Sequence, residues 1–422
     1  MGLSLNGNWT FNGSWLLNPA IQATAGSVTP VTAFTFDYIN SFYPFSSVVN
    51  GALPYTYYVS SGTLPTGISI DPTTGVVYGA CTTLTGYPTA SVVFSVKDAN
   101  NVVASTTATV SFTVTRGPIT INYLVVAGGG GGGMGGGGGG GVLTGTASVT
   151  YGNTINISVG IGGTGGAAPL RQGTNGANSA ISGTTISTVT AVGGGSGGGQ
   201  SVTVPTAWGK PGGSGGGGGY GTAAQPLGFG FAFGSPGAQG VAGPGGYPGA
   251  PGDPSSTPTI NRNWASGGGG GAGAAGTAGT STVPANTNVT GVGGPGGAGK
   301  LWPFDGQLYG GGGGGAASSP VCGIPVFSMT QGTGGSGGGG SAGPSGTQAG
   351  SPGTSNLGGG GGGTWTGPAG GSGGPGSVRL AILTRCYPGS APGASVSTPP
   401  AAPGYTILTY ITPPASPYTY TA

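Results

Sequence analysis

The chain has 422 residues, of which only 3% are charged: eight are Lys or Arg, five are Asp, and neither Glu nor His occurs. Without His and Glu the sequence lacks the usual general bases and most metal ligands, so we expect no cofactor and no metal site. A net charge of +3 leaves no basic stripe for nucleic acid, and no apolar run is long enough to insert into a membrane.

Residues 1–25 form a short Asn- and Gly-containing segment that carries Trp9 and Trp15. We expect an extended N-terminal arm. Its two tryptophans either dock on another protein or pack on the domain that follows.

Residues 26–117 have the pattern of an all-β domain. Apolar and polar residues alternate in 109–114 and, less cleanly, in 92–96, which predicts two half-buried strands with a turn at 97–101. Upstream, residues 62–75 read Gly-Thr-Leu-Pro-Thr-Gly-Ile-Ser-Ile-Asp-Pro-Thr-Thr-Gly. This Leu-Pro-x-Gly strand followed by Asp-x-x-Thr-Gly resembles the immunoglobulin-like modules repeated in bacterial and phage surface proteins. The resemblance implies a β-sandwich that spaces or adheres.

The next region holds most of the 107 glycines, and several stretches place them at every third residue. Examples are Gly234 to Gly252, Gly267 to Gly279 and Gly367 to Gly376. A period of three is neither helical nor strand-like; it is the repeat of polyproline II. An all-glycine edge lets a second backbone approach closely. The spacing therefore predicts a bundle of extended helices rather than a flexible linker.

Such a bundle must hold itself together through backbone hydrogen bonds. A polyproline II helix has none internally, and glycine is the costliest residue to order, so isolated runs would not fold. At 3.1 Å per residue, a run of thirteen residues would span about 40 Å. Run 128–141, which is glycine on nearly every edge, is expected near the middle of the bundle, and run 234–252 at its periphery.

Apolar strands flank the glycine region at 123–127 and 378–383, and we expect them to pair and close a small β collar. Two further strands are predicted at 147–151 and 154–160. This arrangement, covering 120–386, resembles the glycine-rich domain of many phage tail-fibre and virion proteins. Residues 387–422 are rich in Pro, Thr and Tyr, and repeated prolines exclude a helix. We expect them to form an extended tail laid on a neighbouring subunit.

The expected fold is all-β plus polyglycine II, with essentially no α-helix. An N-terminal docking arm (1–25) precedes an immunoglobulin-like β-sandwich (26–117), a glycine-rich domain with loop inserts (118–386) and a Pro-rich tail (387–422). The three cysteines are far apart in the sequence. Buried thiols are expected, and a Cys322–Cys386 bridge is the open alternative.

Large aromatic side chains occur in the inserts between glycine runs. If the runs lie side by side, these inserts gather at the ends of the bundle, where they either recognise a partner or cap the bundle with apolar surface. The alternation resembles adhesins at the tips of long tail fibres in T-even-like phages, which implies loops that contact the host receptor. The candidate contact residues are Phe229, Phe231, Phe233, Trp264, Trp302, Phe304, Tyr309 and Phe327.

The functional expectation is a non-enzymatic virion protein, with a receptor-binding tail fibre favoured over a head fibre, a capsid decoration protein or another tail-associated protein. Other virion proteins and a host cell-surface glycan or outer-membrane protein are the expected partners, and a homotrimer is one option. A surface-polysaccharide depolymerase would need two nearby carboxylates, drawn from Asp37, Asp253 and Asp305. A cellular glycine-rich wall protein is a further alternative.

Overall fold

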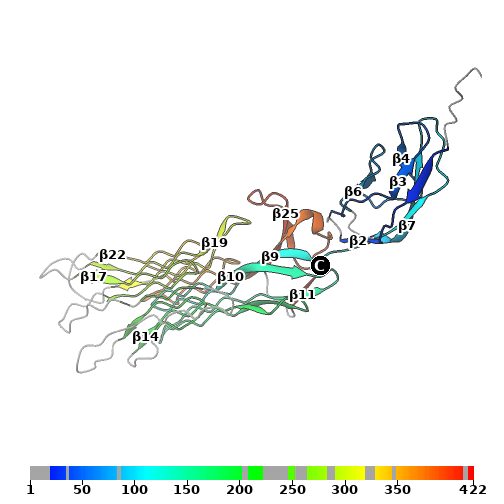
Figure 1. Ribbon diagram of the computed structural model, residues 1–422. Coiled ribbons are helices and arrows are strands. Elements are labelled where there is room, and N and C mark those ends of the chain that lie inside the picture. The colour runs from blue at the N-terminus through cyan, green and yellow to red at the C-terminus, as the bar shows by residue number, and fades with distance from the viewer. Residues whose placement is uncertain are drawn as a thin grey trace, which may run out of the picture. The chain divides into compact units, whose positions relative to one another are not determined.

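The computed structural model describes residues 20–34, 38–82, 87–201, 208–221, 246–250, 252, 264–282, 290–318, 328–344, 348–411 and 417–422. The chain divides into two compact units, Met1–Gly117 and Pro118–Ala422 (Figure 1). The described residues form strands, turns and extended segments with no α-helix, and one 3-10 turn occurs at Thr384–Cys386. The all-β prediction is confirmed.

The described part of the first unit contains eight strands. They are β1 (Gln22–Ala25), β2 (Val31–Phe34), β3 (Phe45–Val49), β4 (Thr56–Ser61), β5 (Ile68–Ile70), β6 (Val77–Gly79), β7 (Tyr87–Lys97) and β8 (Ala108–Thr115). One sheet has the order β2-β8-β7-β4, and β1 pairs with β3 and β5 with β6. The sandwich therefore begins earlier than expected, because β1 lies within the segment 1–25 that was predicted to be an arm.

The core of this unit follows from the alternation along its central strands. Val92, Phe94 and Val96 of β7 are fully buried, as is Phe112 of β8. Of the residues between them on β7, Val93 is partly covered, and Ser95 is buried on the opposite face of the sheet. The Asp-x-x-Thr-Gly motif forms the β5–β6 turn, where the Asp71 carboxylate accepts the backbone N–H of Thr73 at 2.7 Å.

The second unit begins with a collar of two sheets. Its strands are β9 (Ile119–Val126), β10 (Val142–Val149), β11 (Thr154–Ser158), β12 (Ser179–Gly183), β13 (Val189–Ala191), β23 (Ser377–Leu383), β24 (Ser395–Ser397), β25 (Tyr405–Tyr410) and β26 (Tyr418–Thr421). The sheet orders are β10-β9-β23-β25-β24 and β13-β12-β11-β26. As predicted, the strands on either side of the glycine region pair: β9 is antiparallel to β23, with Val125 opposite Val378.

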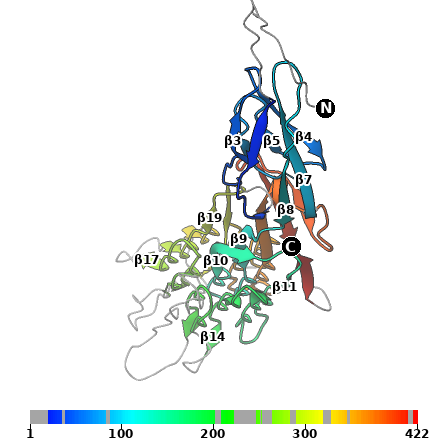
Figure 2. The ribbon, with the colours of Figure 1, turned by 45° about the vertical axis from the view of Figure 1, so that its right-hand side comes forward.

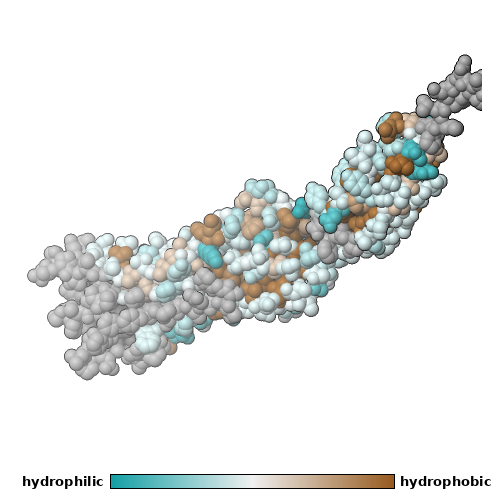
Figure 3. Space-filling model, viewed as in Figure 1, coloured by the Kyte–Doolittle hydropathy of each residue, from teal (hydrophilic) through white to brown (hydrophobic). Residues whose placement is uncertain are grey.

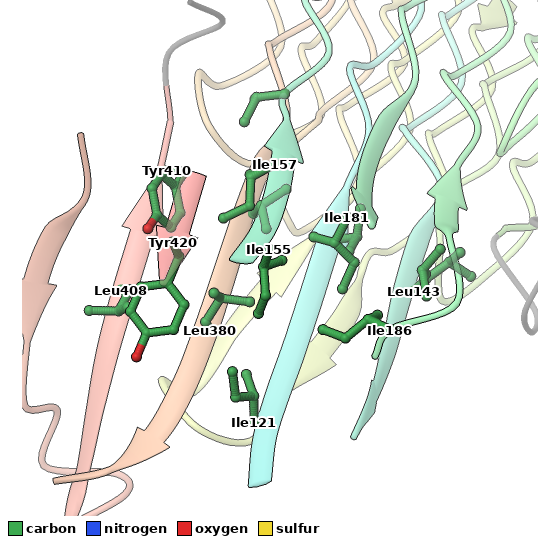
Figure 4. Close-up of a cluster of buried hydrophobic side chains, with 14 of the residues drawn as sticks. Ile121, Leu143, Ile155, Ile157, Ile181, Ile186, Leu380, Leu408, Tyr410 and Tyr420 are labelled. Carbon is green, nitrogen blue, oxygen red and sulfur yellow. The ribbon is translucent and has the colours of Figure 1, made fainter. Parts of the chain in front are cut away.

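Apolar side chains from both collar sheets meet in one core. Ile121, Leu380 and Leu408 from the first sheet pack with Ile155 and Ile181 from the second, and all five are fully buried (Figure 4). Since β9 and β23 come from opposite ends of the glycine region, this core fixes the two ends of that region beside each other.

The Pro-rich tail differs from the expectation. Rather than being free to lie on a neighbouring subunit, it completes the collar of its own chain: β25 pairs with β23, and β26 pairs with β11. The physical reason is the apolar patch at its centre, since Ile407, Leu408 and Tyr410 are buried to 1% exposure or less.

Between the collar strands, the strands of the described glycine region form short ladders. They are β14 (Gln200–Ser201), β15 (Tyr220–Gly221), β16 (Trp264–Ala265), β17 (Thr280–Thr282), β18 (Thr290–Val292), β19 (Lys300–Trp302), β20 (Gln307–Tyr309), β21 (Ala317–Ser318) and β22 (Ser328–Thr330). The described segments that connect them are extended and lie side by side (Figures 1 and 2).

Backbone hydrogen bonds between these segments repeat every three residues. The N–H groups of Gly128 and Gly131 donate to Ala177 and Thr174, on one neighbouring segment. Those of Gly129 and Gly132 donate to Gly374 and Gly371, on a second neighbour, and that of Gly130 donates to Gly138, on a third. Packed threefold helices would bond in this way, and the polyglycine II interpretation rests on this repeat.

Run 128–141 lies deep in the bundle, as its glycine edges predict, and every residue from 124 to 143 is buried. It is not one straight helix of about 40 Å. The chain reverses at Met134, so that Gly130 N–H reaches Gly138 O at 2.8 Å. Met134 carries the only side chain of the run, which packs with Ala316, Ala342 and Trp365 at the edge of the lattice.

Candidate functional site

Several of the short ladders lie at one end of the bundle, which we name the distal end. Ladders β14–β15, β16–β21 and β17–β18–β22 lie there, away from the collar strands β9 and β10 (Figures 1 and 2). Inserts 283–289 and 319–327 each leave one of these strands and return to another, and insert 202–207 follows β14 directly. The ladders therefore bring the strands that flank separate inserts to the same end of the bundle.

Three large apolar side chains exposed on the described part of the distal end are Leu170, Trp208 and, in β18, Val292. Leu170 is 54% exposed and Trp208 is 43% exposed. They belong to neighbouring segments, because the Gln172 side-chain amide donates to the carbonyl of Trp208 at 3.4 Å. An exposed Trp beside an exposed Leu is the composition of a protein- or sugar-contacting surface.

The base beneath this surface is held by packing and a hydrogen bond. Met134 and Trp365 are buried against Ala316 and Ala342, so they close the end of the lattice. The Arg171 guanidinium donates to the carbonyl of Gly367, which joins the turn that carries Leu170 to the turn that carries Trp365. A contact surface on such a base loses little conformational entropy when a partner binds.

The insert 300–309 lies at the opposite end of the bundle, against the collar. Trp302 is 2% exposed and Tyr309 is fully buried, and both pack with Leu124 and Val126 of β9. The prediction that these two side chains contact a receptor is therefore wrong; they cap the bundle instead. Phe304 is partly buried in the same cluster, with its ring centroid 5.2 Å from that of Trp302.

An ion pair fixes this hairpin to the collar. Arg379 of β23 contacts the Asp305 carboxylate, and its guanidinium carbon lies 5.0 Å from the centre of the Tyr309 ring. The Tyr309 hydroxyl donates to Asp305 at 2.6 Å. Burial, and then the hydrogen bond to Asp305, raise the pKa of Tyr309, so the phenol stays protonated and remains a donor.

The carboxylates of the described residues are all engaged in structure. Asp305 is held by Arg379 and Tyr309. Asp71 and Asp98 accept backbone N–H groups of turns, and these hydrogen bonds lower the pKa of both. Within the described ranges no group of three His, Cys, Asp or Glu side chains is placed to hold a metal ion. Asp37 and Asp253 lie outside those ranges.

Several sequence-predicted residues lie outside the described part of the chain. They are Trp9, Trp15, Phe229, Phe231, Phe233 and Phe327, together with Cys322 of the considered disulfide. The backbone of Trp264 belongs to β16, where it pairs with Ser318.

Leu170 and Trp208 at the distal end were missing from the predicted contact residues. Trp208 carried a usable signal, because it is an aromatic residue beside the glycine run that begins at Gly209. Leu170 carried none, since a single Leu after Pro169 does not differ from a core residue in sequence.

Comparison with protein families agrees with this architecture. The model of the glycine-rich domain family matches residues 104–382, which is more than half of the chain. The chain belongs to the glycine-rich domain family. The model described as "Putative Ig domain" matches residues 2–115, in the first unit. A search among curated proteins returned no matching sequence. No helix in the described ranges has the length and apolar character needed to cross a membrane.

Proposed function

We propose that this glycine-rich protein is a non-enzymatic structural protein of a bacteriophage particle, and that it acts as a tail-fibre adhesin. The distal end contacts the host surface, and the collar and first unit connect it to other virion proteins. The host partner is a cell-surface glycan or an outer-membrane protein. The observation that carries the proposal is the clustering of the strands that flank separate inserts at one end of a self-bonded backbone lattice.

The contacts within the described residues favour display over catalysis. The three described carboxylates hydrogen-bond with backbone N–H groups, an arginine and a tyrosine, and each thereby holds a turn or a hairpin in place. Exposed Trp208 and Leu170, by contrast, stand on a base that hydrogen bonds and packing hold in place.

A head fibre, a capsid decoration protein or another tail-associated protein is the second candidate. The division into two units favours it, because a sandwich followed by a long lattice also suits a spacer between two docking sites. In that case Trp9 and Trp15 would dock on the particle and the distal end would bind no receptor.

Binding of the purified chain to host cells tests the adhesin proposal. We expect Trp208→Ala to weaken binding by about 30-fold, because an aromatic anchor at the centre of an interface contributes 2 kcal/mol or more. Leu301→Ala is the matched control, since Leu301 is also exposed, at 54% against 43% for Trp208, but belongs to the collar-end hairpin.

Gold-labelled antibodies on intact particles separate the two candidates. Label at the fibre tip, together with the loss of binding in Trp208→Ala, is the expected result. Label on the capsid, or equal binding by both variants, would reject the distal end as the attachment face.

A further inference from the structure

The first unit carries an open hollow on its outer surface. It has a volume of about 450 Å³ and is lined by Thr56, Tyr58, Lys97, Asn101 and Val103. These residues belong to β4, to the end of β7 and to the turn that follows it. The volume is within the range of small-molecule sites.

The pairing of β4 with β7 explains why these side chains face outward. Thr56 lies opposite Lys97, and Tyr58 lies opposite Ser95. The intervening residues Phe94 and Val96 point into the core, where both are fully buried. Strand alternation therefore places Thr56, Tyr58, Ser95 and Lys97 on the other face of the sheet.

The turn beside the hollow is fixed by a buried carboxylate. Asp98 accepts N–H groups from Asn100 and Val102 at 2.9 Å each, and from Ala52 at 3.0 Å. Asn101 is held in the left-handed region, with φ of 62°, and its side-chain oxygen accepts a hydrogen bond from the Lys97 ammonium at 2.8 Å. The two polar groups are thus positioned before any ligand arrives.

The Lys97 charge is not neutralised by a carboxylate within the described residues, whose one ion pair joins Arg379 and Asp305. The ammonium keeps donors beyond the one given to Asn101, and the Asn101 amide keeps its own N–H donors. The hollow therefore offers a cation and amide donors beside the ring of Tyr58 and the half-exposed side chain of Val103.

The same face carries an unsatisfied hydroxyl. Ser95 is 1% exposed, and its Oγ has no hydrogen-bond partner among the described residues. It occupies the register position opposite Tyr58 and two residues before Lys97. A buried hydroxyl without a partner is unfavourable.

We propose that this hollow binds a saccharide that carries a carboxylate, such as a uronic acid. The C–H face of the sugar ring packs on Tyr58 and Val103, its carboxylate pairs with Lys97, and its hydroxyls accept hydrogen bonds from Asn101. The site lies entirely within the first unit and does not depend on the attachment function of the distal end.

Isothermal titration of the full chain tests the site, with trigalacturonate as the acidic probe and galactotriose as the neutral one. We expect only trigalacturonate to bind, with an affinity that falls as salt is added. Lys97→Met should weaken binding at least about tenfold, because a hydrogen bond to a charged group contributes about 1.5–3 kcal/mol. Lys210→Met, at an exposed lysine of the second unit, should bind like the unchanged chain.

Asn101→Gly gives a second test that does not disturb the fold, since glycine readily adopts the positive φ of that position. This substitution should also weaken the binding of trigalacturonate. Equal binding of the neutral sugar would overturn the assignment of an acidic ligand. No binding of either sugar, or full affinity in both Lys97→Met and Asn101→Gly, would remove the site altogether.

Discussion

At the scale of single residues, glycines inside the lattice such as Gly137 leave no room for a side chain. Gly137 donates its N–H to Gly361 and accepts from Gly313, each at 2.8 Å. A Cβ added to it would lie 2.1 Å from the carbonyl oxygen of Gly130. Because that neighbour is backbone and is itself hydrogen-bonded, it cannot rotate away as a side chain could.

We therefore expect Gly137→Ala to lower the free energy of unfolding of the second unit by about 3 kcal/mol, the upper end for an overpacked core. Gly389→Ala is the control. Nothing lies within 4 Å of that position and only its positive φ of 85° opposes a side chain, at a cost of about 1 kcal/mol. Guanidinium unfolding followed by Trp302 and Trp365 fluorescence measures both. If both substitutions lower the free energy of unfolding equally, the lattice can accommodate an added methyl group and the prediction fails.

At the scale of elements, the β19–β20 hairpin depends on its ion pair. The side chains of Arg379 and Asp305 are 17% and 9% exposed, so each would be left nearly buried without the other. Removing one partner of a buried pair usually costs about 3–5 kcal/mol, whereas replacing both costs much less.

A double-mutant cycle tests this dependence. Asp305→Asn and Arg379→Met should each destabilise the second unit by several kcal/mol, about as much as other broken buried pairs, and together by less than their sum. Lys300→Met on the same hairpin should have little effect, because no ion pair involves it within the described residues. Additive losses from Asp305→Asn and Arg379→Met would show that the pair is not coupled.

Sequence alone predicted elements whose pattern is local. The pairing of β9 with β23 was predicted from the two apolar strands that flank the glycine region. The buried position of run 128–141 was predicted because nearly every residue of that run is glycine. The reversal at Met134 could not be predicted, because one Met among glycines does not show whether the chain passes or turns there.

The sequence also does not show at which end of the bundle each insert lies. Trp302 and Tyr309 have the same aromatic, glycine-flanked setting as the other inserts, and only the three-dimensional path of the chain places them at the collar. The tail was misassigned for a related reason. Its prolines suggested an unpaired segment, yet Ile407 and Leu408 carry enough apolar surface to complete the collar core.

At the scale of the whole molecule, two units with separate cores should unfold separately. The first unit alone contains Asp71 and Asp98, whose pKa values are lowered by backbone N–H donors. An unfolded Asp has a pKa of about 3.9, so these carboxylates stabilise the unit fully above that pH. The stabilisation is lost as the pH falls through their lowered folded values.

Calorimetry at a series of pH values should therefore show one transition that moves to lower temperature in acid. Asp98→Asn should lower the midpoint temperature of that transition at neutral pH. The midpoint of this variant should then fall less than that of the unchanged chain between about pH 5 and pH 2. The transition of the second unit serves as the internal control and should not move with this substitution. A shift of both transitions would mean that the two units unfold together.

Packing backbone against backbone also sets how the glycine region responds to temperature. Unfolding of an ordinary domain exposes hydrocarbon to water, which raises the heat capacity, whereas exposed peptide groups lower it. The buried glycine runs bring mainly N–H and C=O groups into water when they separate. The free energy of unfolding of the glycine region should therefore change little with temperature. Cooling should destabilise this region far less than it destabilises a domain with a hydrophobic core.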